Sequence, residues 1–266
     1  MVSERAIGVF DSGVGGLTVL KELCRQLPGE ELIYLGDTAR VPYGTKSPST
    51  VSRYAQEAAS FLTALGVKAL VVACNTASAV ALPQLEARFG VPVFGVIQPG
   101  AARAVQLTRT RRVGVIGTEG TIKSSAYTRA IQALDPRIEV RTTACPLFVP
   151  LAEEGWAEHP IALQVAQEYL GGLGLGDIDA LVLGCTHYPL FKTILGQVFG
   201  PEVALVDSAE ETAAAVARVL AEGDLLRRSP PGPHRFFVTD VPERFERVGG
   251  AFWGEPLVGV KQVEIG

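Results

Sequence analysis

Short runs of valine, isoleucine and leucine recur along this chain, with turns and helical segments between them. Uninterrupted apolar strands of this kind are typical of a parallel sheet that helices cover on both faces. The runs predicted as strands are Ile7–Phe10, Leu32–Leu35, Ala69–Ala73, Val93–Ile97, Val113–Ile116, Ala180–Leu183 and Val203–Val206. The pattern predicts an α/β fold.

The helical segments between these runs are marked by their apolar period and by their ends. Thr50–Leu65 has the clearest period, with Ser49 as a possible cap and Gly66 as a possible stop. Pro160–Gly171 and Glu210–Glu222 are two further predicted helices. Strands that alternate with helices in this way favour doubly wound units.

An internal repeat is visible when the ends of two predicted strands are aligned. Ile7-Gly-Val-Phe-Asp-Ser-Gly resembles Val113-Gly-Val-Ile-Gly-Thr-Glu, and one cysteine follows each strand end by 63 or 68 residues. Chance similarity between two strands of the same class is the alternative explanation. We predict two pseudo-symmetric doubly wound parallel-sheet domains of about 100 residues each, with the active site between them.

The tail after Leu220 differs from the two repeats. A linker rich in proline and arginine, residues 227–233, precedes strand-like His234–Asp240, helix-like Pro242–Gly249 and strand-like Leu257–Ile265. We expect this tail to return to the first unit. The predicted domains are therefore residues 1–97 with 208–266, and residues 98–207.

Composition excludes several classes of protein. The net charge of −4 gives no basic bias toward nucleic acid, and no segment has the roughly 20 apolar residues of a membrane span. The first residues lack the apolar core of a signal peptide, so we expect a cytoplasmic protein. The four cysteines are widely spaced without a CxxC, which predicts neither a disulfide framework nor a metal site.

Two of these cysteines stand in matching contexts. Cys74 follows Leu70-Val-Val-Ala and precedes Asn-Thr, and Cys185 follows Leu181-Val-Leu-Gly and precedes Thr-His. A thiol at a helix N-terminus has a lowered pKa, so each could serve as a base. A buried structural cysteine is the alternative, and it is the prediction for Cys24 and Cys145.

The other polar groups at the strand ends allow more than one interpretation. Asp11 could orient an ammonium group or cap a turn, and His187 could tune the nearby thiol or cap a helix. Glu153 and Glu154 are by default two exposed loop acids. Gly13-Val-Gly-Gly16 does not meet the GxGxxG spacing, because position 18 is threonine, so a small carboxylate is a better ligand than a dinucleotide.

Five stretches, in this order and spacing, resemble the glutamate racemases of the cofactor-independent aspartate/glutamate racemase superfamily. They are Phe10-Asp-Ser-Gly-Val-Gly-Gly-Leu-Thr18, Gly36-Asp-Thr-Ala-Arg-Val-Pro-Tyr-Gly44, Ala73-Cys-Asn-Thr-Ala-Ser78, Cys145-Pro-Leu-Phe-Val-Pro-Leu-Ala-Glu-Glu-Gly155 and Leu183-Gly-Cys-Thr-His-Tyr-Pro-Leu190. The resemblance implies interconversion of L- and D-glutamate for peptidoglycan, without metal or pyridoxal phosphate, in a protein that is often a homodimer.

The same resemblance implies roles for individual residues. Cys74 and Cys185 correspond to the two acid/base thiols, and Asp11, His187 and Glu153 correspond to groups that assist them. The implied substrate-binding residues are Asp11, Ser12, Pro42, Tyr43, Gly44, Asn75, Thr76, Thr118, Thr121, Thr186 and His187. An aspartate or other amino-acid racemase of the superfamily, or a non-catalytic module that binds small anions, are the alternative functions.

Overall fold

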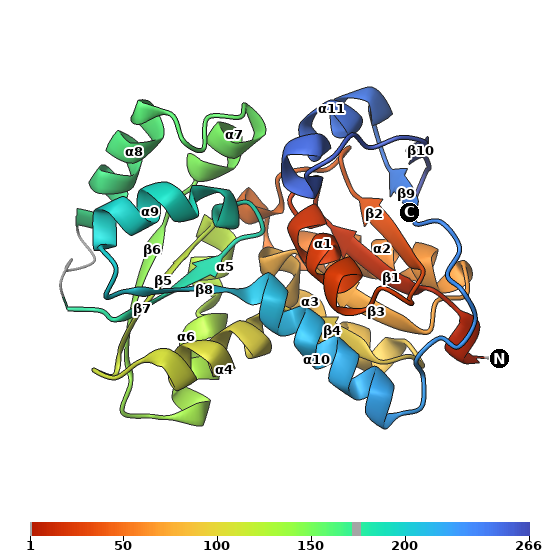
Figure 1. The fold of residues 1–266 in the computed structure, drawn as a ribbon, viewed down its shortest axis with the longest axis horizontal. Coiled ribbons are helices and arrows are strands. Elements are labelled where there is room, and N and C mark those ends of the chain that lie inside the picture. The colour runs from red at the N-terminus through yellow and green to blue at the C-terminus, as the bar shows by residue number, and fades with distance from the viewer. Residues whose placement is uncertain (1, 172–176) are drawn as a thin grey trace.

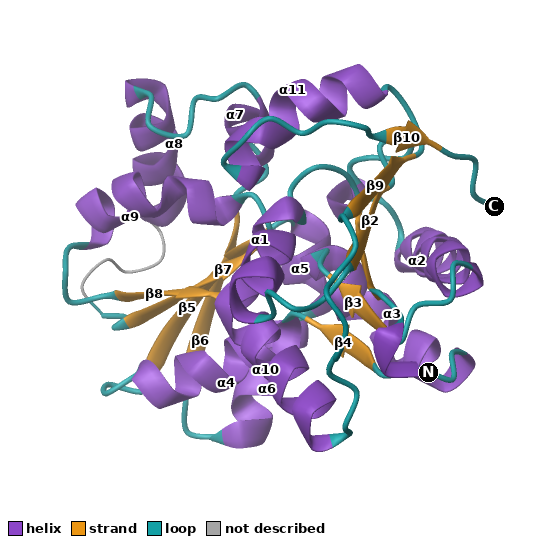
Figure 2. Ribbon diagram, turned by 45° about the vertical axis from the view of Figure 1, so that its right-hand side comes forward, coloured by secondary structure: helices purple, strands orange, loops and turns teal. Residues whose placement is uncertain are grey.

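The computed structural model describes residues 2–171 and 177–266, and two parallel sheets organise them (Figure 1). We call the part built on the six-stranded sheet the first lobe and the part built on the four-stranded sheet the second lobe. The predicted α/β class with parallel sheets is therefore confirmed. Helices lie on both faces of each sheet, as the turned view also shows (Figure 2).

The sheet of the first lobe has the order β10-β9-β2-β1-β3-β4, with every pair parallel. Its strands are β1 (Ile7–Asp11), β2 (Leu32–Gly36), β3 (Ala69–Val72), β4 (Val93–Gly95), β9 (Arg235–Val238) and β10 (Lys261–Gln262). Strands β1, β2 and β3 are buried throughout, which explains their uninterrupted apolar sequence.

The sheet of the second lobe has the order β6-β5-β7-β8, again with every pair parallel. Its strands are β5 (Arg112–Gly117), β6 (Glu139–Ala144), β7 (Ala180–Gly184) and β8 (Ala204–Asp207). This order matches β2-β1-β3-β4 strand for strand, so β1 corresponds to β5 and β3 to β7. Strand β6 was not predicted, because this edge strand, Glu-Val-Arg-Thr-Thr-Ala, has no apolar run.

The α-helices complete both lobes. They are α1 (Leu17–Gln26), α2 (Pro48–Ala64), α3 (Asn75–Arg88), α4 (Ile97–Leu107), α5 (Glu119–Ser124), α6 (Ala126–Leu134), α7 (Phe148–Glu153), α8 (Pro160–Leu170), α9 (Lys192–Phe199), α10 (Ser208–Glu222) and α11 (Pro242–Trp253). Short 3-10 helices lie at Val2–Glu4, Tyr43–Thr45 and Tyr188–Phe191. In the described chain, no helix combines the length and the apolar character needed to cross a membrane.

Some predicted boundaries are wrong, each for a local reason. The N-cap of α2 is Ser47 rather than Ser49, and its hydroxyl accepts the Thr50 N–H ahead of a proline at the first helical position. The predicted strand Leu257–Ile265 shrinks to β10, because only two of its residues pair with β9. The last predicted helix continues to Trp253, where Gly254 adopts a positive φ and ends it.

The chain passes from one lobe to the other after β4 and again after β8. Helix α4 leads into β5, and α10 leads back, running from between the lobes to the lower side of the first lobe in Figure 1. Strands β9 and β10 then extend the first sheet beside β2. On this membership we propose the domain division 1–97 with 208–266, and 98–207.

A buried ion pair fixes the tail against the first lobe. The Nζ atom of Lys68 lies 2.5 Å from Glu30 Oε2 and donates hydrogen bonds to the carbonyls of Ser3 and Leu225, each at 2.7 Å. Glu30 Oε1 also accepts the Arg227 N–H at 2.8 Å. Both charged side chains are at most 2 % exposed, so each depends on the other for compensation.

Replacing Lys68 with methionine is expected to lower the free energy of unfolding by about 3–5 kcal/mol, because Glu30 is left charged and buried. Urea unfolding of both proteins measures the difference. The matched control is Lys123→Met, which breaks an exposed pair with Glu119 and is expected to cost at most about 0.5 kcal/mol. Equal losses in the two variants would contradict this account of the tail.

Candidate active site

The carboxyl ends of the two sheets face each other and enclose a narrow cavity with about 30 Å³ of accessible space. Its walls come from both lobes and include both matched thiols. The lining residues are Ser12, Val41, Pro42, Tyr43, Gly44, Cys74, Asn75, Thr76, Thr118, Val149, Cys185, Thr186 and His187. Of the residues predicted for the site, Asp11, Thr121 and Glu153 lie behind this wall rather than in it.

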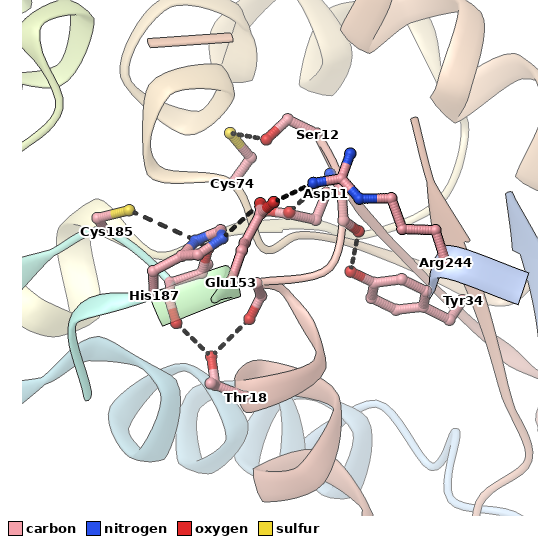
Figure 3. A network of polar contacts seen from close by, with 12 residues as sticks. Asp11, Ser12, Thr18, Tyr34, Cys74, Glu153, Cys185, His187 and Arg244 are labelled. Atoms are coloured by element: carbon pink, nitrogen blue, oxygen red, sulfur yellow. Dashed lines mark hydrogen bonds and ion pairs between the residues drawn. The ribbon is translucent and has the colours of Figure 1, made fainter. Parts of the chain in front are cut away.

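Cys74 stands where β3 ends and is the N-cap of α3. Its sulfur accepts the Ala77 N–H at 3.5 Å and lies 3.8 Å from the Ser12 hydroxyl (Figure 3). The sequence suggests a lowered thiol pKa at this position, and that prediction is wrong. Burial and the nearby Asp11 charge raise the pKa of Cys74 to about 12 and outweigh the helix N-terminus, so the thiol is protonated near neutral pH.

Cys185 follows β7 and has a different environment. The prediction that a helix starts directly after it is only partly right, because a 3-10 helix, Tyr188–Phe191, stands between the thiol and α9. The His187 side chain makes no helix-capping hydrogen bond. Its Nδ1 atom instead lies 3.9 Å from the Cys185 sulfur and 3.4 Å from Thr186 Oγ1. His187 is therefore a neighbour of the thiol.

His187 is buried, and a carboxylate holds its second nitrogen. Its Nε2 atom lies 3.2 Å from Glu153 Oε1. Burial alone would lower the pKa of His187, but hydrogen bonds to Cys185 and Glu153, and the charges of Cys185 and Asp11, raise it to about 10. The ring is therefore an imidazolium at neutral pH and places a positive charge beside Cys185.

Glu153 is the last residue of α7, and its side chain is only 17 % exposed. The default expectation of an exposed loop acid is therefore wrong. Burial opposes ionisation of this carboxyl, but the hydrogen bond and charge of His187 and the charge of Arg244 lower its pKa. Arg244 Nη2 lies 3.1 Å from Glu153 Oε2. Glu153 therefore joins the imidazolium to an arginine of the tail.

Asp11 is fully buried at the end of β1. Its Oδ2 atom accepts the Gly13 N–H at 2.9 Å, while Oδ1 has no hydrogen-bond partner among the described residues. Burial raises the pKa of Asp11, against the opposing charge of His187 and the backbone N–H groups around it. The loop that follows needs glycine at position 16 for a steric reason. A Cβ atom there would lie 2.5 Å from the Asp11 Cβ and 2.9 Å from the Tyr34 hydroxyl.

A cluster of hydroxyl and amide groups closes the cavity between the lobes. The Oγ1 atom of Thr76 lies 2.9 Å from that of Thr118 and 3.2 Å from that of Thr121. Asn75 Oδ1 accepts the Tyr127 hydroxyl at 2.7 Å, and the buried Nδ2 has no partner in the part of the chain that the structure describes. An unpaired buried donor beside hydroxyls favours an anionic ligand such as a carboxylate.

Asp37 anchors the loop that carries Pro42, Tyr43 and Gly44 through contacts of its carboxylate. The Tyr43 hydroxyl donates to Asp37 Oδ2, and the Arg40 guanidinium also contacts this carboxylate, at 2.7 Å. Asp37 is fully buried at the end of β2, next to β1. Asp37 was not among the predicted site residues. Its position directly after an apolar strand, like that of Asp11, was the signal that could have identified it.

Other contributors carried no local signal in the sequence. Thr18 Oγ1 lies 3.0 Å from the Gly15 carbonyl and 3.1 Å from the Thr186 carbonyl, and so ties α1 to the second lobe. Tyr127 and Arg244 act on predicted residues from helices distant in sequence. Among residues 2–171 and 177–266, no three His, Cys, Asp or Glu side chains are grouped to hold a metal ion.

Comparison with known proteins gives consistent matches over nearly the whole chain. Residues 7–216 match the Asp/Glu/hydantoin racemase family. The glutamate racemase of Geobacter metallireducens is 61% identical and covers 98% of this chain and 97% of its own. The solved structure of the glutamate racemase isoform RacE1 of Bacillus anthracis has a TM-score of 0.94 and 41% sequence identity to this chain. The glutamate racemase of Francisella tularensis, solved with D-glutamate, has a TM-score of 0.92 and 41% identity. Each comparison covers 98% of both chains.

The unequal charges beside the two thiols predict unequal reactivity. We expect iodoacetamide to alkylate Cys185 faster than Cys74 at pH 7. Burial and the Asp11 charge raise the pKa of Cys74 and oppose its reactive thiolate form, whereas the cationic His187 ring lies 3.9 Å from the Cys185 sulfur. The two side chains are similarly accessible, at 6% and 5% exposed. Peptide mapping by mass spectrometry measures both rates, with Cys145, whose pKa burial raises to about 12, as the slow control. Faster labelling of Cys74 would contradict this assignment.

Proposed function

This chain belongs to the Asp/Glu/hydantoin racemase family, and from that membership we propose that it is a glutamate racemase, an isomerase that interconverts L- and D-glutamate. The observation that carries the proposal is the pair of thiols, Cys74 and Cys185, which line one cavity from different lobes. Racemisation needs a proton removed from one face of the α-carbon and another added to the opposite face. Two thiols that line one cavity from different lobes can provide both steps.

The proposed reaction moves two protons in sequence. One cysteine, as thiolate, takes the α-proton and becomes a thiol, and the electron pair of the C–H bond remains on the substrate as a carbanion delocalised into the carboxylate. The other cysteine, as thiol, gives its proton to the opposite face and becomes a thiolate. We propose that Cys185 deprotonates L-glutamate and that Cys74 deprotonates D-glutamate.

Groups around the cavity support this chemistry by stabilising charge. The unpaired Asn75 amide and the hydroxyls of Thr76 and Thr118 can donate to the substrate carboxylate, where negative charge grows during proton removal. The enclosed wall limits water around these donors, which strengthens each interaction. Asp11 assists on the Cys74 side, and His187 with Glu153 assists on the Cys185 side.

The remaining proposed contacts bind the substrate rather than react with it. They comprise Ser12, Pro42, Tyr43, Gly44, Thr121 and Thr186. Thr121 reaches the cavity through Thr76 and Thr118, and the others line it. We propose that the product D-glutamate supplies peptidoglycan synthesis. A homodimer and a cytoplasmic location also remain predictions.

We propose glutamate rather than another substrate of the superfamily, because the matched relatives are glutamate racemases and the matches cover nearly their full length. An aspartate racemase remains the alternative within the same mechanism. A comparison of rates with glutamate and aspartate under one condition separates them.

The primary test of the proposed activity uses L-glutamate in deuterated water with no added cofactor. We expect D-glutamate to form and to carry α-deuterium, because the thiol that donates to the opposite face has exchanged its proton with the solvent. Chiral chromatography and mass spectrometry measure the two quantities. Absence of both products from folded protein would exclude the proposed activity.

Replacing either thiol tests the two-base mechanism. Cys74→Ser and Cys185→Ser are each expected to lower kcat for racemisation at least about 100-fold, because a serine hydroxyl is a far weaker acid than a thiol and hardly forms its conjugate base near neutral pH. Cys24→Ser is the matched control, since Cys24 lies away from the cavity beside His234. Near wild-type racemisation by either active-site variant would rule out a mechanism that needs both thiols.

A further inference from the structure

Helix α11 of the tail contacts the surroundings of the second thiol from two directions. The Phe252 ring packs edge-on against the His187 ring, with centroids 5.1 Å apart. Arg244, eight residues earlier on the helix, pairs with Glu153. Residues four and eight apart share one side of an α-helix, so a single face of α11 carries both contacts. Figures 1 and 2 both show α11 beside α7, the helix that ends at Glu153.

These contacts form one continuous line from the tail to the sulfur. Arg244 Nη2 lies 3.1 Å from Glu153 Oε2, and Glu153 Oε1 lies 3.2 Å from His187 Nε2. His187 Nδ1 in turn lies 3.9 Å from Cys185 Sγ (Figure 3). The two carboxylate oxygens are thus divided between two cations, one in the site and one in the tail.

We propose that Arg244 is a positioning residue for racemisation: its ion pair holds Glu153 against His187 and so keeps the imidazole aligned with Cys185. This inference rests on the proposed function, since it assigns Cys185 a proton-transfer step. Arg244 touches neither thiol and lies outside the lining of the cavity. It acts only through Glu153.

The need for such a residue follows from the position of Glu153. It ends a helix of six residues, and Gly155 turns the chain just after it with a φ of 74°. A glutamate has several rotatable bonds, so a single contact with His187 leaves it free to turn toward water. Arg244 contacts the second oxygen, so that both oxygens of the Glu153 carboxylate have a cationic partner.

Other charged groups lie near the pair of Arg244 and Glu153, but none of them takes the place of Arg244. Glu154 and Arg247 line the same surface hollow, and Asp240 lies just before α11. Within the described chain, the cationic partners of Glu153 are His187 and Arg244. Arg247 lies one turn further along α11 and has no ion pair within the described chain, which makes it a matched control.

The pair also connects the two lobes. Glu153 belongs to the second lobe, whereas the tail that carries Arg244 joins the first sheet through β9. Separation of the lobes would part the two side chains. Alignment of His187 therefore depends on the lobes being together, which is also the condition for both thiols to reach one substrate.

The experiment measures kcat and KM for both enantiomers in Arg244→Met, Arg244→Lys and the control Arg247→Met. We expect Arg244→Met to lower kcat about 10-fold with little change in KM, because proton transfer at Cys185 slows while substrate contacts remain. Arg244→Lys retains the charge and is expected to recover most of the rate. Arg247→Met is expected to match the wild type.

Isotope effects separate positioning from a general structural defect. In Arg244→Met, the primary isotope effect with α-deuterated L-glutamate is expected to rise and that with α-deuterated D-glutamate to fall, because only the Cys185 step slows. Adding Arg244→Met to Glu153→Gln is expected to cost no further activity. Equal isotope changes for both enantiomers, or additive losses in the double variant, would overturn the inference.

The outcome also distinguishes this inference from the proposed function. An active wild type together with unchanged kcat in Arg244→Met overturns the role of Arg244 and leaves the racemase proposal standing. A folded wild type without racemisation overturns the proposed function, and the inference with it.

Discussion

Burial of charge between two facing sheets is the constraint on which the site depends. The carboxyl ends of β1, β3, β5 and β7 meet there, so ionisable side chains lose water when the lobes come together. Each such group is then controlled by its immediate partners. Asp11 accepts a hydrogen bond from a backbone N–H group, and the His187 ring is paired with the Glu153 carboxylate. Partners rather than solvent therefore decide which groups carry charge, and a proton-transfer site needs that control.

The fold is repeated in the two lobes, whereas the charges around the thiols differ. Strands β3 and β7 hold equivalent places, and a thiol follows each. Cys74 faces an acidic neighbour, and burial with that charge keeps it protonated; Cys185 faces an imidazolium. Similar backbones therefore place the two thiols beside neighbours of opposite charge. The two positions are unequal for proton transfer, although the strands that carry them are equivalent.

Features that depend on a local sequence pattern were predictable, whereas contacts between residues distant in the sequence were not. Buried strands such as β1 and β3 were predictable because both faces are apolar, whereas β6 is an edge strand with charged and polar side chains. Both thiols were found from matching strand ends. The pKa of Cys74 was not predictable, because burial outweighs the helix N-terminus. The Arg244 contact joins residues 91 apart, and no periodicity records it.

The tail accounts for part of the difference between the lobes. Strands β9 and β10 widen the first sheet beyond the four-stranded order that both lobes share, and α11 lies between them in the chain. From there α11 reaches the Cys185 side, with Phe252 against the His187 ring and Arg244 on Glu153. A repeated fold alone would give both thiols similar neighbours. An appended segment that contacts one of them is a direct physical way to make two equivalent positions chemically unequal.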